Sequence, residues 1–128
     1  MAARQTVLVV EDDPALRRMY RTVLALAGFD VVEAEDGLHA LHRIEERAPD
    51  LIILDLLLPT VSGLIVLQEI AANAHTRNIP VVIVTGSDIN PGAVDVPCVM
   101  RKPVSPEQLL QAVKTCLQNG SSGGVRAS

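Results

Sequence analysis

Residues 51–59, Leu-Ile-Ile-Leu-Asp-Leu-Leu-Leu-Pro, form a continuous apolar run with one carboxylate, Asp55, in its middle. Pro49 and Asp50 precede the run and Pro59 ends it. An apolar run bounded by turn residues is typical of a strand buried on both faces of a parallel sheet. A carboxylate in such surroundings is costly to desolvate and needs a partner or a function. Taken alone, Asp55 is more simply interpreted as a cap of the strand end or of the next loop.

Outward from this strand, apolar β-type runs alternate with segments of helical periodicity. Strand patterns occupy 6–10, 31–34, 51–55, 80–85 and 97–101, and helical patterns follow Asp13-Pro14, Asp36-Gly37, Gly63 and Ser105-Pro106. Strict alternation predicts an α/β fold, a doubly wound, flavodoxin-like, five-stranded parallel sheet of order 2-1-3-4-5. Residues 86–96 carry too many Gly and Pro residues for a regular helix, so we expect a loop or a single turn there and a fourth helix that is reduced or absent.

Composition narrows the class of protein. The 128 residues suit one domain, which we place at 1–118, and 119–128 read as a flexible tail or linker remnant. A net charge of −4 without a basic cluster disfavours a nucleic-acid surface. The chain contains no apolar run long enough for a membrane span, so we expect a soluble, cytoplasmic protein. Cys98 and Cys116 match no metal-site spacing and are predicted to be reduced thiols that pack in the core.

Reactive side chains follow the ends of four predicted strands. Glu11 and Asp12 follow the first, Asp55 the third, and Thr85 and Lys102 end the fourth and fifth. The carboxyl ends of parallel strands share one edge of the sheet, where ligands bind at the point at which the strand order reverses. The sequence therefore predicts that these side chains converge, which makes a simple capping role for Asp55 the weaker interpretation.

The chemistry of this group suits a phosphoryl group held beside Mg²⁺. Without a cation, three carboxylates would repel one another and some would have to be protonated. Hard oxygen ligands favour Mg²⁺ as that cation, whereas none of the three His residues lies at a strand end to favour Zn²⁺. Lys102 can contact a phosphate oxygen and Thr85 can donate to another. The chain has no Gly-rich loop of the nucleotide-binding type, so the phosphoryl group must come from another donor, with Asp55 as a possible acceptor.

With these motifs in view, the chain resembles a CheY-like response-regulator receiver domain over about residues 6–117. The resemblance rests on Glu11-Asp12-Asp13-Pro14, on Asp55 with Pro59 and Gly63, on Thr85-Gly86 and on Lys102-Pro103. It implies that Asp55 is the phospho-acceptor and that Mg²⁺ is held by Asp55 and Asp12 directly, by Glu11 through water and by the backbone carbonyl of Leu57.

The resemblance also implies roles for the remaining residues and for partners. Thr85 would be the switch hydroxyl, Lys102 would contact the phosphate, and the Lys102-Pro103 bond would be cis. The donor would be a phosphohistidine on a sensor histidine kinase or on a histidine phosphotransfer protein. Such a domain catalyses only its own phosphorylation and dephosphorylation and signals by changing its protein contacts, although the output partner cannot be named from the sequence.

Two departures from the family pattern bear on output. The aromatic residue usual three positions before the lysine is replaced by Val99, and the segment between Thr85 and Lys102 is short, so the family's usual output face is expected to be altered. Leu57 is a bulky apolar neighbour of Asp55 that cannot orient a water molecule, which predicts slow self-dephosphorylation.

Two alternatives follow from the same residues. A pseudo-receiver that signals without phosphorylation is favoured by these two departures and disfavoured by the complete set of site residues. An aspartyl-phosphate phosphatase or phosphotransferase is disfavoured because Leu57 stands where such enzymes typically carry a second Asp.

Overall fold

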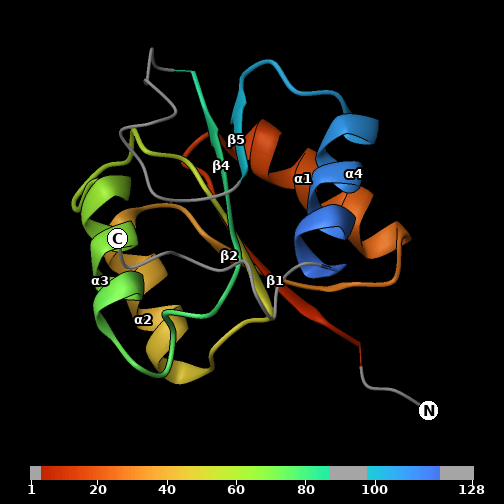
Figure 1. Ribbon diagram of the computed structural model, residues 1–128. Coiled ribbons are helices and arrows are strands. Elements are labelled where there is room, and N and C mark those ends of the chain that lie inside the picture. The colour runs from red at the N-terminus through yellow and green to blue at the C-terminus, as the bar shows by residue number, and fades with distance from the viewer. Residues whose placement is uncertain (1–3, 87–97, 119–128) are drawn as a thin grey trace.

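The computed structural model describes residues 4–86 and 98–118. Within these described residues, five strands and four helices follow one another (Figure 1). In chain order they are β1 (Thr6–Val10), α1 (Pro14–Leu26), β2 (Asp30–Ala34), α2 (Gly37–Glu46), β3 (Leu51–Leu54), α3 (Gly63–Ala72), β4 (Val81–Thr85), β5 (Cys98–Arg101) and α4 (Pro106–Gln118).

The strands form one parallel sheet in the order β2-β1-β3-β4-β5, which confirms the predicted fold class. In the central pair, Val10 lies opposite Leu54, so the residues that follow β1 and β3 emerge side by side. β3 is shorter than the apolar run suggested, because it ends at Leu54 and Asp55 begins the loop to α3.

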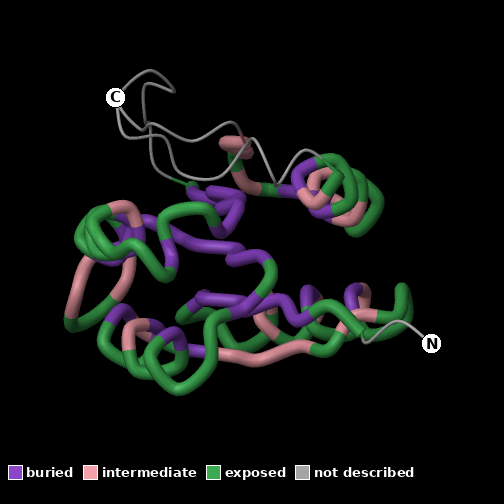
Figure 2. Tube along the Cα trace, turned by 60° about the horizontal axis from the view of Figure 1, so that its bottom comes forward, coloured by how far each residue is buried: buried purple, intermediate pink, exposed green. Residues whose placement is uncertain are grey.

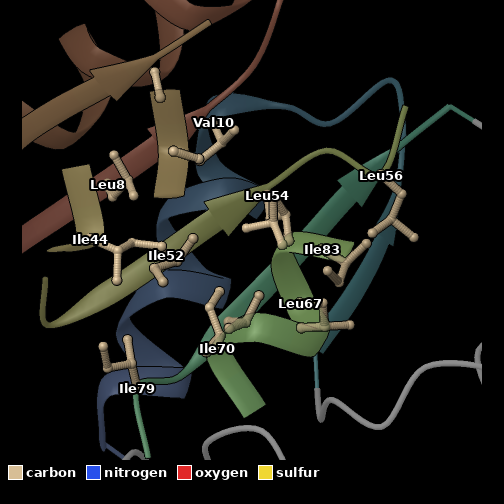
Figure 3. Close-up of a cluster of buried hydrophobic side chains, with 14 residues drawn as sticks. Leu8, Val10, Ile44, Ile52, Leu54, Leu56, Leu67, Ile70, Ile79 and Ile83 are labelled. Carbon is tan, nitrogen blue, oxygen red and sulfur yellow. The ribbon is translucent and has the colours of Figure 1, made fainter. Parts of the chain in front are cut away.

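Alternate residues of the strands face two apolar layers, as the two-residue period of a strand requires. Figure 1 shows α2 and α3 on one side of the sheet and α1 and α4 on the other. Figure 3 shows the layer beneath α2 and α3, where Leu8, Ile52 and Leu54 of the sheet meet Ile44 and Ile70 of the helices. The tube in Figure 2 is buried along the inner strands and exposed along the outer loops. Burial on both faces explains why the strands read as unbroken apolar runs.

Helix starts follow the capping signals in the sequence. The Asp13 side chain accepts hydrogen bonds from the backbone N–H groups of Ala15 and Leu16, and Pro14 takes the first helical position of α1. Asp36 caps α2 in the same way through the N–H of His39. Among the described helices, none is long and apolar enough to cross a membrane.

One prediction about the cysteines is wrong. Cys98 and Cys116 are joined by a disulfide with their Cα atoms 7.3 Å apart, instead of being separate thiols. The residues meet because α4 starts beyond the carboxyl end of β5 and runs back over the sheet, which brings its last turn to the start of β5. This return of the helix is a tertiary feature that cysteine spacing does not encode.

Two expectations fall outside the described residues. The reduced or absent helix and the loop predicted for 86–96 fall, from residue 87 on, in the segment that the structure does not describe, and the tail predicted at 119–128 lies beyond the last described residue. The last helix expected from Ser105-Pro106 is present as α4.

Candidate functional site

The backbone places Glu11 and Asp55 next to each other at the carboxyl edge of the sheet. Each follows the last residue of a central strand, and the parallel ladder continues past both: the N–H of Asp55 donates to the carbonyl of Val10 at 3.2 Å, and the N–H of Glu11 to that of Ala34 at 3.1 Å. Both side chains are almost fully buried, with residue exposures of 1% for Glu11 and 5% for Asp55. Two buried carboxylates side by side require a cation.

Lys102 supplies that cation from the end of β5. Its Nζ lies 2.5 Å from Oε1 of Glu11 and 2.8 Å from Oδ2 of Asp55. The N–H of Lys102 also donates to the carbonyl of Thr85 at 2.9 Å, so the lysine is anchored to the end of the neighbouring strand. The Lys102-Pro103 bond is cis, as the family resemblance implied. The sequence pattern predicts that Lys102 contacts a phosphate, and in this structure its ammonium bridges the two acids.

The pKa shifts follow from this burial and pairing. Burial raises the pKa of Glu11, and the hydrogen bond from Lys102 opposes this rise. Burial alone would lower the pKa of Lys102, but its hydrogen bonds to Asp55 and Glu11 outweigh that effect and raise the pKa well above the usual lysine value. The lysine is therefore charged at any physiological pH, and the site combines two buried acids with a fixed positive charge.

Asp12 completes a group of carboxylates that fits a divalent ion. Asp12 is exposed, whereas Glu11 and Asp55 are buried, and the three residues can offer one oxygen each within 4.8 Å of one another. A small cluster of oxygen ligands with one solvent-facing member suits Mg²⁺, which keeps part of its water shell. The donor set thus fits the ion predicted from the sequence.

The predicted Leu57 and Thr85 also lie around Asp55. The N–H of Leu57 donates to Oδ1 of Asp55 at 3.0 Å, and the Leu57 residue is 62% exposed. Thr85 ends β4, the strand next to β3, and is 2% exposed. The six residues singled out from the sequence therefore come from the ends of β1, β3, β4 and β5 and share one edge of the sheet.

The loop after Asp55 is held in place by close backbone contact, which hydrophobic periodicity alone does not predict. The N–H of Gly63 donates to the carbonyl of Leu56 at 3.0 Å. A Cβ at Gly63 would stand 2.2 Å from the carbonyl oxygen of Asp55, closer than any real contact. Gly37 likewise abuts the backbone of Val61. Each helix start packs directly on the loop that follows the acid, and the absence of a side chain at Gly63 and Gly37 is the sequence signal for it.

Comparisons with known proteins agree with this geometry. Residues 7–114 match the model of the response regulator receiver domain. The chain is 38% identical over 127 residues to the phosphate regulon transcriptional regulatory protein PhoB of Klebsiella pneumoniae, covering 93% of this chain and 54% of that protein. It is 35% identical over 123 residues to the DNA-binding response regulator MtrA of Mycolicibacterium smegmatis, covering 90% of this chain and 51% of that protein. The chain thus spans about half the length of the curated relatives it matches.

Solved structures give the same result over whole chains. A putative response regulator from Chloroflexus aurantiacus superposes with a TM-score of 0.83 at 29% identity, covering 91% of this chain and 99% of that one. The signal receiver domain of a putative Luxo repressor protein from Vibrio parahaemolyticus gives 0.82 at 30% identity, covering 94% and 95%. The chain therefore belongs to the response regulator receiver domain family.

Proposed function

We propose that this chain is a phosphorylated receiver, in which Asp55 accepts a phosphoryl group in a Mg²⁺-dependent reaction and the modified domain changes its protein contacts. The observation that carries the proposal is the contact of Lys102 with both Asp55 and Glu11 at the edge of the sheet. As a receiver domain of two-component signal transduction, the chain is a signalling protein rather than a turnover enzyme.

The reaction is a transfer between two nucleophiles. An oxygen of Asp55 attacks the phosphorus of the donor, the bond from phosphorus to the donor nitrogen breaks, and the nitrogen keeps the electron pair. The product is an acyl phosphate on Asp55. Charge on the transferring oxygens increases as the donor bond breaks, so fixed cations near Asp55 lower the barrier.

Each site residue has a defined part in this chemistry. Lys102 turns from the Asp55 carboxylate to a phosphoryl oxygen, and the hydroxyl of Thr85 donates to another. Asp12, Asp55 and, through water, Glu11 would hold the Mg²⁺, with the backbone carbonyl of Leu57 as a further ligand. When bound, the ion supplies charge stabilisation to the phosphoryl oxygens and to the crowded acids.

The donor in this proposal is a phosphohistidine on a sensor histidine kinase or a histidine phosphotransfer protein. The relatives named above are described as transcriptional or DNA-binding regulators, but this chain aligns with only about half of each. We therefore assign to this chain the receiving step and leave its output to a protein partner, with no nucleic-acid contact within it. The paired Lys102 and acids support this function over a pseudo-receiver that signals without phosphorylation.

The test is incubation with Mg²⁺ and acetyl phosphate followed by intact mass measurement. We expect a gain of one phosphate that disappears in Asp55→Asn and when Mg²⁺ is chelated. Asp50→Asn is the matched control, because Asp50 precedes β3 at the opposite edge of the sheet, where its side chain accepts from the N–H of Thr6. An unchanged mass in the wild type, or an equal gain in Asp55→Asn, contradicts the proposal.

A further inference from the structure

Tyr20 is a buried polar side chain for which the proposed reaction has no role. It lies on α1 with 1% exposure and is the only tyrosine of the chain. Its apolar neighbours belong to the layer beneath α1 and α4, which also contains Val9, two residues before Glu11, and Val104, two residues after Lys102. The ring therefore belongs to the same apolar layer as residues that lead directly into the site.

Helix geometry and electrostatics both favour a Tyr20 hydroxyl directed toward the site. Long side chains on a helix lean toward its N-terminus, and α1 begins at Pro14, directly after the acids that follow β1. Electrostatics agree with this direction: burial raises the pKa of Tyr20, the charge of Lys102 opposes the rise, and the charges of Glu11 and Asp55 add to it. The phenol thus lies within the field of the Lys102 cluster.

This hydroxyl donates no hydrogen bond to any residue in the described part of the chain. A buried hydroxyl without a partner costs free energy, so its retention calls for a state in which it is paired. Val99, at the position where the family usually has an aromatic residue, packs against the other layer, beneath α2 and α3. Tyr20 is on the opposite face and is not a shifted copy of that residue.

The pairing of Glu11 shows where a donor becomes necessary. Oε2 of Glu11 accepts from the N–H of Asp13 at 3.1 Å, while Oε1 is held by Lys102. When Asp55 carries a phosphoryl group, Lys102 moves to the new anionic oxygens, and Oε1 of the buried Glu11 loses its protein donor and keeps only water of the Mg²⁺ site. A second protein donor would lower the cost of keeping this buried carboxylate charged.

We propose that Tyr20 is a positioning residue of the site, whose hydroxyl donates to Glu11 when Lys102 turns to the phosphoryl group, an inference that rests on the proposed phosphorylation of Asp55. No proton is transferred, since the phenol remains protonated and only the hydrogen bond forms. Tyr20 thereby holds Glu11 in place through the exchange and favours the phosphorylated form.

The first experiment uses the absorption of Tyr20 itself. The chain has no tryptophan, so this one tyrosine dominates the long-wavelength part of its near-ultraviolet absorption, above the weaker contributions of Phe29 and the disulfide. A phenol that donates to a carboxylate absorbs at longer wavelength than one without an acceptor. With Mg²⁺ and beryllofluoride, a stable mimic of the phosphoryl group, we expect a red shift in the wild type that saturates with binding and is absent in Asp55→Asn.

The second experiment uses Tyr20→Phe, which removes the hydroxyl and keeps the ring. In the unmodified state, we expect the melting temperature of this variant to be equal to or above that of the wild type. We expect its binding midpoint, the beryllofluoride concentration that half-saturates the site as followed by fluorine NMR, to be raised about three- to tenfold. The matched control is Leu24→Met, a volume-conserving change of a fully buried neighbour on α1, which should leave the midpoint unchanged.

The outcomes separate this inference from the proposed function. If beryllofluoride binds to the wild type without shifting the tyrosine band, the role of Tyr20 is overturned and the proposed function stands. The same holds if beryllofluoride binds with an equal midpoint in the wild type and in Tyr20→Phe. An equal rise of the midpoint in Leu24→Met also overturns it, because core packing would then explain the effect. If the wild type neither binds beryllofluoride nor gains a phosphate, the proposed function fails and the role of Tyr20 fails with it.

Discussion

Lys102 controls the electrostatics of the site at the scale of single residues. It is the counter-charge for two buried acids, and removing one member of a buried charge cluster leaves the others uncompensated. Its side chain is 19% exposed, so solvent screens this interaction only partly. The sequence could place a lysine at this edge, but the direction of its side chain follows from the spacing of β1, β3 and β5 in the folded sheet.

Lys102→Met should therefore destabilise the unmodified protein. We expect the free energy of unfolding to fall by about 2–4 kcal/mol near neutral pH without divalent ions, and Mg²⁺ to restore part of it. Urea unfolding measures the change, with Lys114→Met on the exposed face of α4 as the control. An equal loss in both variants would mean that the Lys102 contacts do not stabilise the fold.

The pH dependence of this contribution has a definite sign. The pKa of Lys102 in the folded state is raised above the usual lysine value of 10.5. Its contribution to folding is thus complete below pH 10.5 and lost as the pH rises through the folded-state value. The stability difference between wild type and Lys102→Met should be constant from neutral pH to that point and shrink above it; a difference that grows there contradicts the assignment.

Leu57 should set the lifetime of the phosphoryl group. The backbone N–H of Leu57 donates to Oδ1 of Asp55, which holds the residue next to the acid. Its side chain is exposed and aliphatic, so it cannot orient an attacking water molecule. We expect Leu57→Asn to speed the loss of phosphate by about tenfold, because an amide can hold the water in position. The decay is followed by intact mass after removal of the donor. The control is Leu64→Asn, the same substitution at an exposed position of α3. Equal phosphate lifetimes in the wild type and in Leu57→Asn refute the assignment.

At the scale of elements, the loop from β3 to α3 fixes the position of Asp55. Gly63→Ala should lower the free energy of unfolding by about 2–4 kcal/mol, because the added methyl group meets the backbone carbonyl of Asp55, which cannot move aside. The control is Gly28→Ala, where φ is +96° but no atom lies within 4 Å of the new Cβ, so the cost is backbone strain of about 1–2 kcal/mol. Chemical denaturation gives the free energy of unfolding of both variants. A smaller loss of this free energy in Gly63→Ala than in Gly28→Ala contradicts the close contact.

The disulfide joins the first residue of β5 to the last turns of α4. A cross-link between residues 18 positions apart lowers the conformational entropy of the unfolded chain. This raises the free energy of unfolding by about 3 kcal/mol. Reductant should therefore lower the denaturation midpoint of the wild type and leave that of the double variant Cys98→Ala, Cys116→Ala unchanged. Alkylation and mass measurement before reduction should find both thiols blocked. Two freely alkylated thiols in the native protein would show that the bond does not form.

At the scale of the whole molecule, the sequence predicted the features that follow from local periodicity. Alternating strands and helices predicted the sheet order, and strand ends predicted which side chains share an edge. Tertiary contacts could not be predicted in this way, because the Cys98–Cys116 bond needs α4 to fold back over the sheet, and the burial of Tyr20 needs α1 to pack on the sheet. Both depend on how the helices pack on the sheet in the folded chain.

The central claim is that the phosphoryl group resides on Asp55. After reaction with acetyl phosphate and Mg²⁺, borohydride reduces an acyl phosphate and converts that aspartate to homoserine, which marks its position in a peptide mass spectrum. The account predicts this conversion at Asp55 and at no other acid, including its neighbours Glu11 and Asp12. Conversion at another residue, or a phosphorylated protein with Asp55 intact, would contradict it.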